Sequence, residues 1–407
     1  MKGIKKKILE NGATCYVINK CGYKEKQAVF GVNFGSCYNE FMTGENKIRV
    51  PMGTAHFLEH KLFEQSGFNV TERFAKNGAI ANAFTNTEQT AYYFSCCENF
   101  EDNLETLLKF VSEKAYSEKS IESEKNIIAK EIEMYKDDDS WNCYYNMLSA
   151  MYSENKVRNN IAGTLSSVME IKKEHLDICY DSFYTFDNSV IICCTDTDEE
   201  KIYEMIEKNL DLSRNTAGKR ILCENDKINS SFVKEKKNLF QTILNLGFKD
   251  VQINGTILDR VCLSKILLDI ILSKSSDLYE ILYNENVIGE EVSYGYNCLT
   301  DSGFCYFNTK SEAPMRFREL FLNNISMILK NGIDTERISR IMKKKRGELE
   351  ISMDKVGNIV NMQLELFSKG ICINDIFEYY ENISEDKLNE RFKALFDPNN
   401  SVLSIIE

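Results

Sequence analysis

The feature that most constrains this chain is the segment 53–61, with the sequence GTAHFLEHK. Two of the three histidines of the protein, His56 and His60, lie here four residues apart. On a helix, residues with this separation share one face, so both imidazoles can point at one ion. Glu59 lies near the same face. Two imidazole nitrogens with a carboxylate beside them predict a zinc site with a base next to it.

The alternative is a surface helix that carries two histidines by chance. The neighbouring side chains argue against a surface position, since they are apolar: Ala55, Phe57, Leu58, Leu62 and Phe63. This pattern predicts a mostly buried helix, and buried polar side chains need partners. A metal ion would be a partner for both histidines at once.

A second helix is predicted to carry carboxylates on its buried face. Ile121, Glu124, Ile128, Glu131 and Tyr135 are spaced 3, 4, 3 and 4 residues apart, which places them on one helix face. A catalytic zinc with three protein ligands needs one more after two histidines, and both glutamates are candidates. The alternative is a buried salt bridge to a lysine or arginine. Three other carboxylates fall off this face and are expected in solvent: Glu122, Glu133 and Asp137.

Between these two helices, residues 79–87 alternate small or polar side chains with larger ones. They precede a clear strand at 90–96. An ordinary edge strand would explain the pattern. Small side chains also leave the backbone of such an edge accessible, so an extended peptide could pair with it.

The chain is long enough for two domains of about 200 residues each. Patterns in the second half repeat those of the first at an offset of about 213 to 217 residues, which indicates an internal duplication. The repeat of the carboxylate helix lies at 338–350, where Glu348 stands in the place of Glu131 and is expected in solvent. A helix at 258–273 takes the place of the histidine helix but holds no histidine.

We therefore expect an N-terminal zinc-binding domain at 1–212, a linker at 213–235, and a homologous domain without metal ligands at 236–407. The order of elements in each copy is strands, helix, strand, long helices, strand. This order predicts an α+β fold of two homologous domains, each an antiparallel sheet covered by helices on one face.

Composition excludes several classes of protein. A net charge of −12 argues against nucleic acid as the main partner. No apolar run approaches the length of a membrane helix, and the basic N-terminus is not followed by the apolar region of a secretory signal. The 14 cysteines show no repeated C-x-x-C spacing. They are expected to be reduced core residues of a cytoplasmic protein.

The chain resembles the inverzincin zinc peptidases, the family of pitrilysin, insulysin and mitochondrial processing peptidase. It looks closest to the single-length bacterial members of about 400 residues. The resemblance rests on the inverted motif H-x-x-E-H at 56–60 and on the segment 77–85 ahead of a Thr-x-Tyr strand. It also rests on Glu124 and Glu131, with six residues between them.

The resemblance implies roles for individual residues. His56, His60 and Glu131 would hold one Zn²⁺ per chain, and Glu59 would take a proton from the zinc-bound water and pass it to the leaving amine. Glu124 would orient a ligand or tune its charge. The edge strand would align the substrate peptide through Ala81, Asn82, Ala83, Phe84 and Thr85. The two domains would form half of a clamshell chamber.

One departure from the family pattern bears on how the chain works. Active members supply an arginine and a tyrosine, seven residues apart, that bind the scissile carbonyl. Here Tyr283 and Glu290 stand at these positions, and a glutamate cannot stabilise an oxyanion. Tyr294 and Tyr296 lie close by and are candidates to substitute.

Single-length members resemble half of the long enzymes, so we expect a dimer to close the chamber. Because this chain lacks the arginine and tyrosine of the family pattern, we also consider a heterodimer. In it, a related subunit without zinc ligands would supply these two residues.

The sequence thus predicts a zinc metalloendopeptidase that acts on unfolded peptides or on the leader of a precursor peptide. The alternative is a non-catalytic subunit of a peptidase complex that serves peptide binding or assembly. Glu59 argues against this alternative, because a subunit that only binds has no need of a base between its ligands. A purely structural zinc site fits less well, since such sites are usually closed by four ligands and rich in cysteine.

Overall fold

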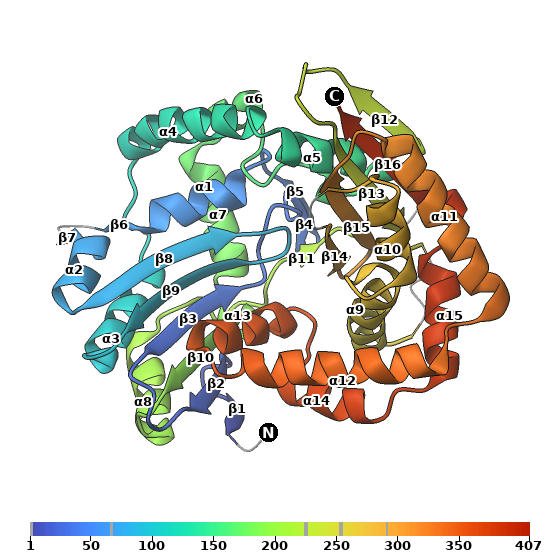
Figure 1. Cartoon of the computed structure of the whole chain (residues 1–407). Coiled ribbons are helices and arrows are strands. Elements are labelled where there is room, and N and C mark those ends of the chain that lie inside the picture. Colours follow the sequence, from blue (N-terminus) through green and yellow to red (C-terminus); the bar gives the residue numbers. More distant parts are fainter. Residues whose placement is uncertain (1–2, 66–67, 224–226, 252–254, 290–291) are drawn as a thin grey trace. The chain divides into compact units, whose positions relative to one another are not determined.

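The computed structural model describes residues 3–65, 68–223, 227–251, 255–289 and 292–407. The chain folds into two compact units, each built from three segments (Figure 1). The first unit contains Met1–Glu133, Asn159–Ile221 and Ile351–Asn374. The second contains Met134–Arg158, Leu222–Glu350 and Asp375–Glu407. Within the described ranges, none of the helices has the length and apolar character that crossing a bilayer requires.

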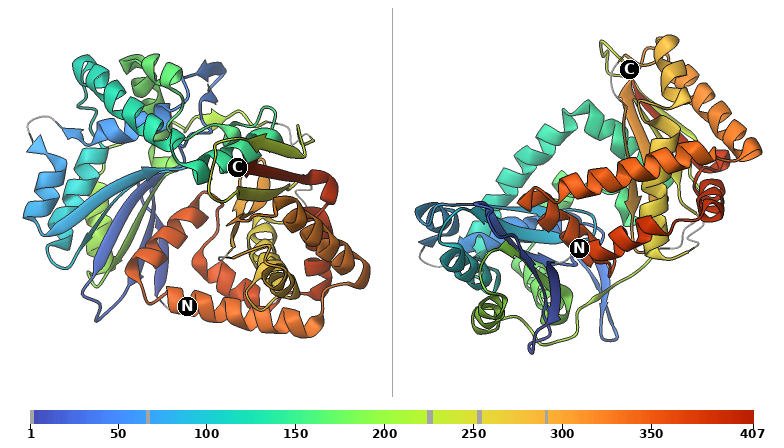
Figure 2. Two further views of the ribbon diagram at one scale, coloured as in Figure 1. Left: turned by 45° about the horizontal axis from the view of Figure 1, so that its top comes forward. Right: turned by 60° about the horizontal axis from the view of Figure 1, so that its bottom comes forward.

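The first unit is organised around a six-stranded sheet, whose blue and cyan strands can be followed from two further sides in Figure 2. Its spatial order is β1 (Ile4–Ile8), β2 (Thr14–Asn19), β10 (Ser189–Thr195), β3 (Lys26–Val32), β9 (Thr90–Cys96) and β8 (Ala79–Thr85). All neighbours are antiparallel except β2 and β10, which are parallel. Strand β8 is therefore an edge strand, as the sequence predicts.

Smaller elements complete this unit. A three-stranded sheet contains β4 (Glu40–Thr43), β5 (Asn46–Arg49) and β11 (Lys219–Arg220), and a two-stranded one β6 (Glu64–Gln65) and β7 (Phe68–Asn69). Its helices are α1 (Thr54–Leu62), α2 (Val70–Lys76), α3 (Phe100–Val111), α4 (Glu118–Lys136), α6 (Leu165–Met169), α7 (Lys173–Phe183), α8 (Glu199–Asn209) and α13 (Val356–Phe367).

The second unit repeats the arrangement of the first. Its five-stranded sheet has the order β12 (Phe232–Glu235), β16 (Ser401–Ile406), β13 (Ile243–Lys249), β15 (Gly303–Lys310) and β14 (Ser293–Cys298), with only β12 and β16 parallel. Its helices are α5 (Asp139–Met151), α9 (Ile257–Leu272), α10 (Asp277–Asn284), α11 (Pro314–Asn331), α12 (Thr335–Ser352), α14 (Ile373–Glu381) and α15 (Glu385–Leu395). Order and strand directions match β2, β10, β3, β9 and β8, as an internal duplication predicts.

The predicted α+β class is confirmed, with two differences in detail. Each sheet contains one parallel pair, because the strand that closes it arrives after a long helical connection and not after a hairpin. Each sheet is also covered on both faces. Helix α13 lies against β3 and β10, and α5 lies against β13 and β16. These four strands are almost entirely buried.

The two covering helices are exchanged between the halves of the chain. Helix α5 follows the first repeat but belongs to the second unit, and α13 follows α12 but belongs to the first unit. The second covering layer of each sheet therefore comes from the other repeat. The division at 213–235 stays a prediction. Within that stretch, β11 joins a sheet of the first unit and β12 joins the sheet of the second.

A glycine in each central strand makes room for the exchanged helix. A Cβ atom on Gly31 would lie 2.4 Å from Cδ1 of Leu364 on α13, and one on Gly247 would lie 2.5 Å from Sδ of Met147 on α5. Both distances are far below van der Waals contact. The close approach of helix and sheet therefore depends on these two positions having no side chain.

We predict that Gly31→Ala destabilises the protein by about 1–3 kcal/mol, because the added methyl overpacks a filled core. Gly347→Ala on α12 is the matched control, since a Cβ there meets nothing within 4 Å. That change should leave stability unchanged or raise it by up to about 1 kcal/mol. The midpoint of urea-induced unfolding measures the change in stability of both variants. Combining Gly31→Ala with Leu364→Ala should recover part of the loss, and equal midpoints for wild type and Gly31→Ala would contradict the prediction.

Candidate metal centre

Helix α1 begins at a position that only glycine can occupy. Gly53 precedes the helix with a φ of 87°, in the left-handed region, and a Cβ there would lie 2.4 Å from the carbonyl oxygen of Ala162. The hydroxyl of Thr54 donates a hydrogen bond to the Pro51 carbonyl at 2.7 Å. These contacts set where the helix starts and so which residues face inward.

The helix is buried, as its apolar neighbours predict. His56 and Glu59 are 9% and 8% exposed, and His60 is half-buried. The centroids of the two imidazole rings lie 4.6 Å apart, so the histidines share one face of the helix. Helix α1 packs mainly against β8 and α7, and it also contacts β9 and β6.

Helix α4 presents its carboxylates as the spacing predicts. Ile121 and Ile128 are buried, and the side chains of Glu124 and Glu131 are 15% and 22% exposed. The three carboxylates expected in solvent are exposed: Glu122, Glu133 and Asp137. The apolar residues of this helix therefore hold two glutamates next to α1.

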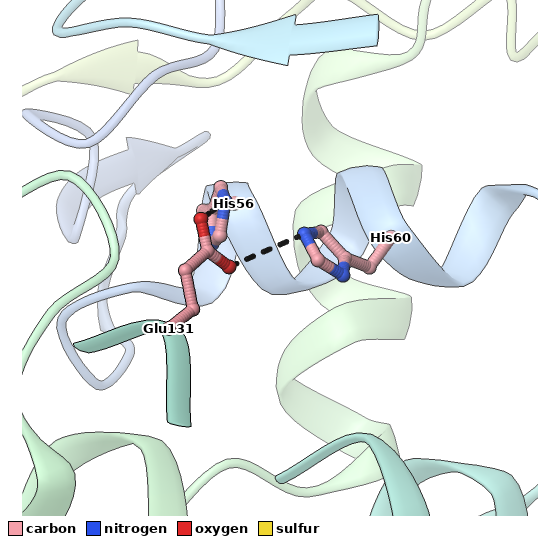
Figure 3. Close-up of side chains that lie close together, drawn as sticks. All are labelled: His56, His60 and Glu131. Atoms are coloured by element: carbon pink, nitrogen blue, oxygen red, sulfur yellow. Dashed lines mark ion pairs between the residues drawn. The ribbon is translucent and has the colours of Figure 1, made fainter. Parts of the chain in front are cut away.

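His56, His60 and Glu131 come together as one cluster. Nε2 of His56 lies 3.6 Å from Oε1 of Glu131, and Nε2 of His60 lies 3.8 Å from Oε2. Figure 3 shows the Glu131 carboxylate pointing toward both rings. One candidate ligand atom from each residue lies within 4.8 Å of the others. Of the two glutamates that the sequence left open as a third ligand, the geometry favours Glu131.

Glu124 instead contacts the far nitrogen of one ring. Its Oε1 lies 3.1 Å from Nδ1 of His60, and its Oε2 accepts a hydrogen bond from Nζ of Lys61 at 3.4 Å. The ring is thereby held with Nε2 toward Glu131. Nδ1 of His56 has no hydrogen-bond partner among the described residues, so that side of the ring lacks the support that Glu124 gives to His60.

Burial and neighbouring charges shift the pKa values in this cluster. Burial, together with His60, lowers the pKa of His56 to about 4, which keeps its imidazole neutral near pH 7. Burial also lowers the pKa of His60, but the hydrogen bond to Glu124 and the nearby carboxylates outweigh it, so that pKa is raised. The hydrogen bond to His60 lowers the pKa of Glu124. Burial raises the pKa of Glu59, and the hydrogen bond from Thr85 offsets part of this.

The residues present fit a zinc ion. Two imidazole nitrogens and a carboxylate oxygen are the three-ligand set of catalytic zinc sites. Glu59, Glu124 and Glu131 also gather negative charge around the two rings. Like charges in a partly buried site are unfavourable unless a cation compensates them.

Glu59 is held from the edge strand. Its Oε2 accepts a hydrogen bond of 2.6 Å from the hydroxyl of Thr85. Sequence reasoning placed Thr85 with the substrate-binding residues and missed this contact. It also missed Lys61, although a lysine inside an apolar helix is a signal that the sequence contains.

The other predicted substrate residues lie along the edge of the sheet. In the described part of the chain, β9 is the single strand partner of β8. Ala81, Ala83 and Phe84 are half-buried and Asn82 is exposed. The N–H of Ala83 donates to Oδ1 of Asn82 at 2.8 Å, a bond that an incoming carbonyl could replace.

The third histidine of the chain has a structural role. His175 lies on α7, far in the sequence from α1, and its Nδ1 accepts a hydrogen bond of 3.2 Å from the backbone N–H of Lys172. It thus helps to begin that helix and, among the described residues, is not part of the group formed by His56, His60 and Glu131.

The tyrosines named as carbonyl-binding candidates make contacts within the second unit. The Tyr296 hydroxyl donates to Asp250 at 2.6 Å, and that of Tyr294 donates to Asp269 at 3.0 Å. Tyr283 is 58% exposed, and Glu290 lies outside the described residues.

Comparison with known proteins identifies the family. Residues 46–165 match the family model described as Insulinase (Peptidase family M16), and residues 170–345 match the Peptidase M16 inactive domain. The chain is 33% identical over 400 residues to YmfH of Bacillus subtilis, which is named an uncharacterized zinc protease. The match covers 94% of this chain and 91% of that protein. The chain therefore belongs to peptidase family M16, which confirms the resemblance seen in the sequence.

Solved structures agree in fold. An M16-like peptidase from Alicyclobacillus acidocaldarius has a TM-score of 0.95 at 29% identity, over 99% of this chain and 97% of that one. Pitrilysin has a TM-score of 0.77 at 15% identity, over 99% of this chain but 44% of its own. A chain of this length thus corresponds to less than half of pitrilysin.

We predict that Glu124→Gln lowers the affinity for zinc by about ten- to one-hundred-fold, because a neutral amide supports the His60 ring less well than a carboxylate. Competition with a chromogenic chelator measures the affinity. Glu122→Gln, on the same helix but with its side chain 68% exposed, is the control and should bind zinc as the wild type does. Equal losses in both variants would contradict a specific role for Glu124.

Proposed function

We propose that this protein is a zinc metalloendopeptidase that cleaves unfolded peptides or the leader of a precursor peptide. One observation carries the proposal. A buried carboxylate, Glu59, lies on the same helix as His56 and His60, and Glu131 completes the ligand set from a second helix. This arrangement combines three protein ligands with a base, which a binding or structural site does not require.

In this proposal His56, His60 and Glu131 hold one zinc ion per chain. When bound, zinc polarises the scissile carbonyl and makes water a better nucleophile. Glu124 fixes the ring of His60 through Nδ1, and the buried Lys61 balances the charge of Glu124. All three proposed ligands belong to the first unit.

Glu59 is the proposed general base. Thr85 occupies its Oε2, which leaves Oε1 to accept a proton from the attacking water and to return it to the leaving amine. Burial raises the pKa of Glu59, so its conjugate acid is a weaker acid than an exposed carboxyl. A raised pKa suits a group that must both take up and release a proton near neutral pH.

The edge strand β8 is the proposed guide for the substrate. An extended peptide could add to the open edge along Ala81, Asn82, Ala83, Phe84 and Thr85 through main-chain hydrogen bonds. Such pairing depends on the backbone of the substrate more than on its side chains. It therefore favours segments that are unfolded.

A second candidate is a non-catalytic subunit that binds peptides or assembles with an active partner. The observation in its favour is that the hydroxyls of Tyr294 and Tyr296 already donate to buried aspartates. The group that binds the scissile carbonyl would then come from elsewhere. For the catalytic candidate we infer a dimer, and we propose a heterodimer in which a related subunit without zinc ligands supplies an arginine and a tyrosine.

We also infer that the protein acts in the cytoplasm. All 14 cysteines lie in the described residues, and none of them is in a disulfide. Reduced cysteines are typical of that compartment.

We predict that Glu59→Gln retains zinc but loses cleavage of an unfolded peptide by about one-hundred- to ten-thousand-fold, because the amide cannot accept a proton. Removing zinc with a chelator should abolish cleavage by the wild type, and adding zinc back should restore it. Metal content and peptide cleavage are measured on the same samples, with Glu122→Gln as the active control. Wild-type protein that holds zinc yet cleaves nothing, alone or with a partner, would support the non-catalytic alternative.

We predict that a related subunit without zinc ligands, co-purified with this chain, raises kcat/KM by at least about tenfold, because it adds a group for the carbonyl oxygen. The comparison uses equal zinc-loaded concentrations of this chain. Substituting the arginine of the partner by alanine should remove the gain. Full activity of this chain as a homodimer would contradict the heterodimer hypothesis.

A further inference from the structure

A short hydrogen bond to Glu59 comes from a residue that the proposed chemistry does not use directly. Thr85 on β8 donates to Oε2 of Glu59 on α1 over 2.6 Å. The two side chains are 9% and 8% exposed, so the bond is shielded from water. A short hydrogen bond to a buried carboxylate is among the strongest of its kind.

The Thr85 hydroxyl is itself held in place. Thr85 and Thr90 face each other in the register of β8 and β9, and their Oγ1 atoms lie 3.2 Å apart. The hydroxyl of the fully buried Thr90 donates to the carbonyl oxygen of Phe34 at 2.7 Å. The single hydrogen of Thr85 is donated to Glu59 and that of Thr90 to Phe34, so the contact between the two Oγ1 atoms is a packing contact. Threonine is also stiff at χ1, so the hydroxyl has little freedom to move.

We propose that Thr85 is a positioning residue that orients the Glu59 carboxylate for proton transfer. This inference rests on the proposed function and deepens it. A glutamate side chain has three rotatable bonds, so an unsupported carboxylate would sample several orientations. Because the hydrogen bond fixes Oε2 against the edge of the sheet, it also fixes the direction in which Oε1 points. The efficiency of a general base depends on that direction.

Thr85 would then hold the carboxylate of Glu59, whereas the sequence placed it among the residues that bind the substrate. Its neighbours toward the middle of β8, Ala81 and Ala83, are half-buried and have no polar side chain. Strand β8 would then have two roles: its open edge would pair with the peptide, and its last residue, Thr85, would orient Glu59.

The test compares Thr85→Val, which removes the hydroxyl at nearly constant shape, with Thr85→Ser, which keeps it. Thr85→Val is expected to lower kcat by about ten- to one-hundred-fold while KM changes less than about threefold and zinc content is unchanged. Thr85→Ser should remain within about threefold of wild type in kcat. Thr195→Val, which removes another buried hydroxyl at the end of β10, is the control and should be active.

Two kinetic outcomes would overturn the inference. A rise in KM with kcat unchanged would mean that Thr85 acts on the substrate, as the sequence alone predicted. A wild-type kcat for Thr85→Val would mean that its hydroxyl has no role in orienting the base.

A measurement on metal-free protein separates this inference from the proposed function. The thermal midpoint is compared for Thr85→Val in the wild-type background and in a Glu59→Ala background. If the hydroxyl bonds to Glu59, the shift caused by Thr85→Val should be clearly smaller in the second background. Equal shifts of the thermal midpoint in the two backgrounds would show that the two side chains do not interact, even if the enzyme is active. An inactive wild type with unequal shifts would overturn the proposed function and leave the contact in place.

Discussion

The burial of polar side chains on helix α1 is the constraint on which the rest of the first unit depends. His56, Glu59 and Lys61 are buried on a helix whose other buried residues are mostly apolar, so each needs a partner that the helix cannot supply. Helix α4 supplies carboxylates to His56, His60 and Lys61, and strand β8 supplies a hydroxyl to Glu59. Three separate elements are thereby fixed to one another around a single polar cluster.

Much of the cluster could be predicted because it follows from spacing along single helices. The separation of His56 and His60 and the buried positions of Glu124 and Glu131 are periodic features that survive in the structure. Which of the two glutamates lies against Nε2 of both histidines depends on how the helices pack, and spacing does not determine that. The partner of Glu59 could not be found in this way either, since Thr85 reaches it from a strand that follows a turn.

The second unit shows how the same framework balances charge without histidines. Asp269 on α9 is 2% exposed and accepts hydrogen bonds from Tyr294 on β14 and Lys344 on α12, and Lys345 is also paired with it. These elements correspond in order to α1, β8 and α4. In the first unit a carboxylate on the long helix faces imidazoles, whereas in the second an ammonium faces a carboxylate. In the second unit, side chains alone therefore compensate the charge of Asp269.

The exchanged helices have a consequence for how the chain is made. Proteins emerge from the ribosome N-terminus first, and a domain can complete its fold only when all its segments are available. The last strand of the first large sheet, β10, ends at Thr195, but its second cover, α13, begins at Val356. Until then one apolar face of that sheet has no permanent neighbour, and the nascent chain must avoid aggregation in the meantime. The second half of the chain is therefore needed to deliver the helix that completes the sheet of the first half.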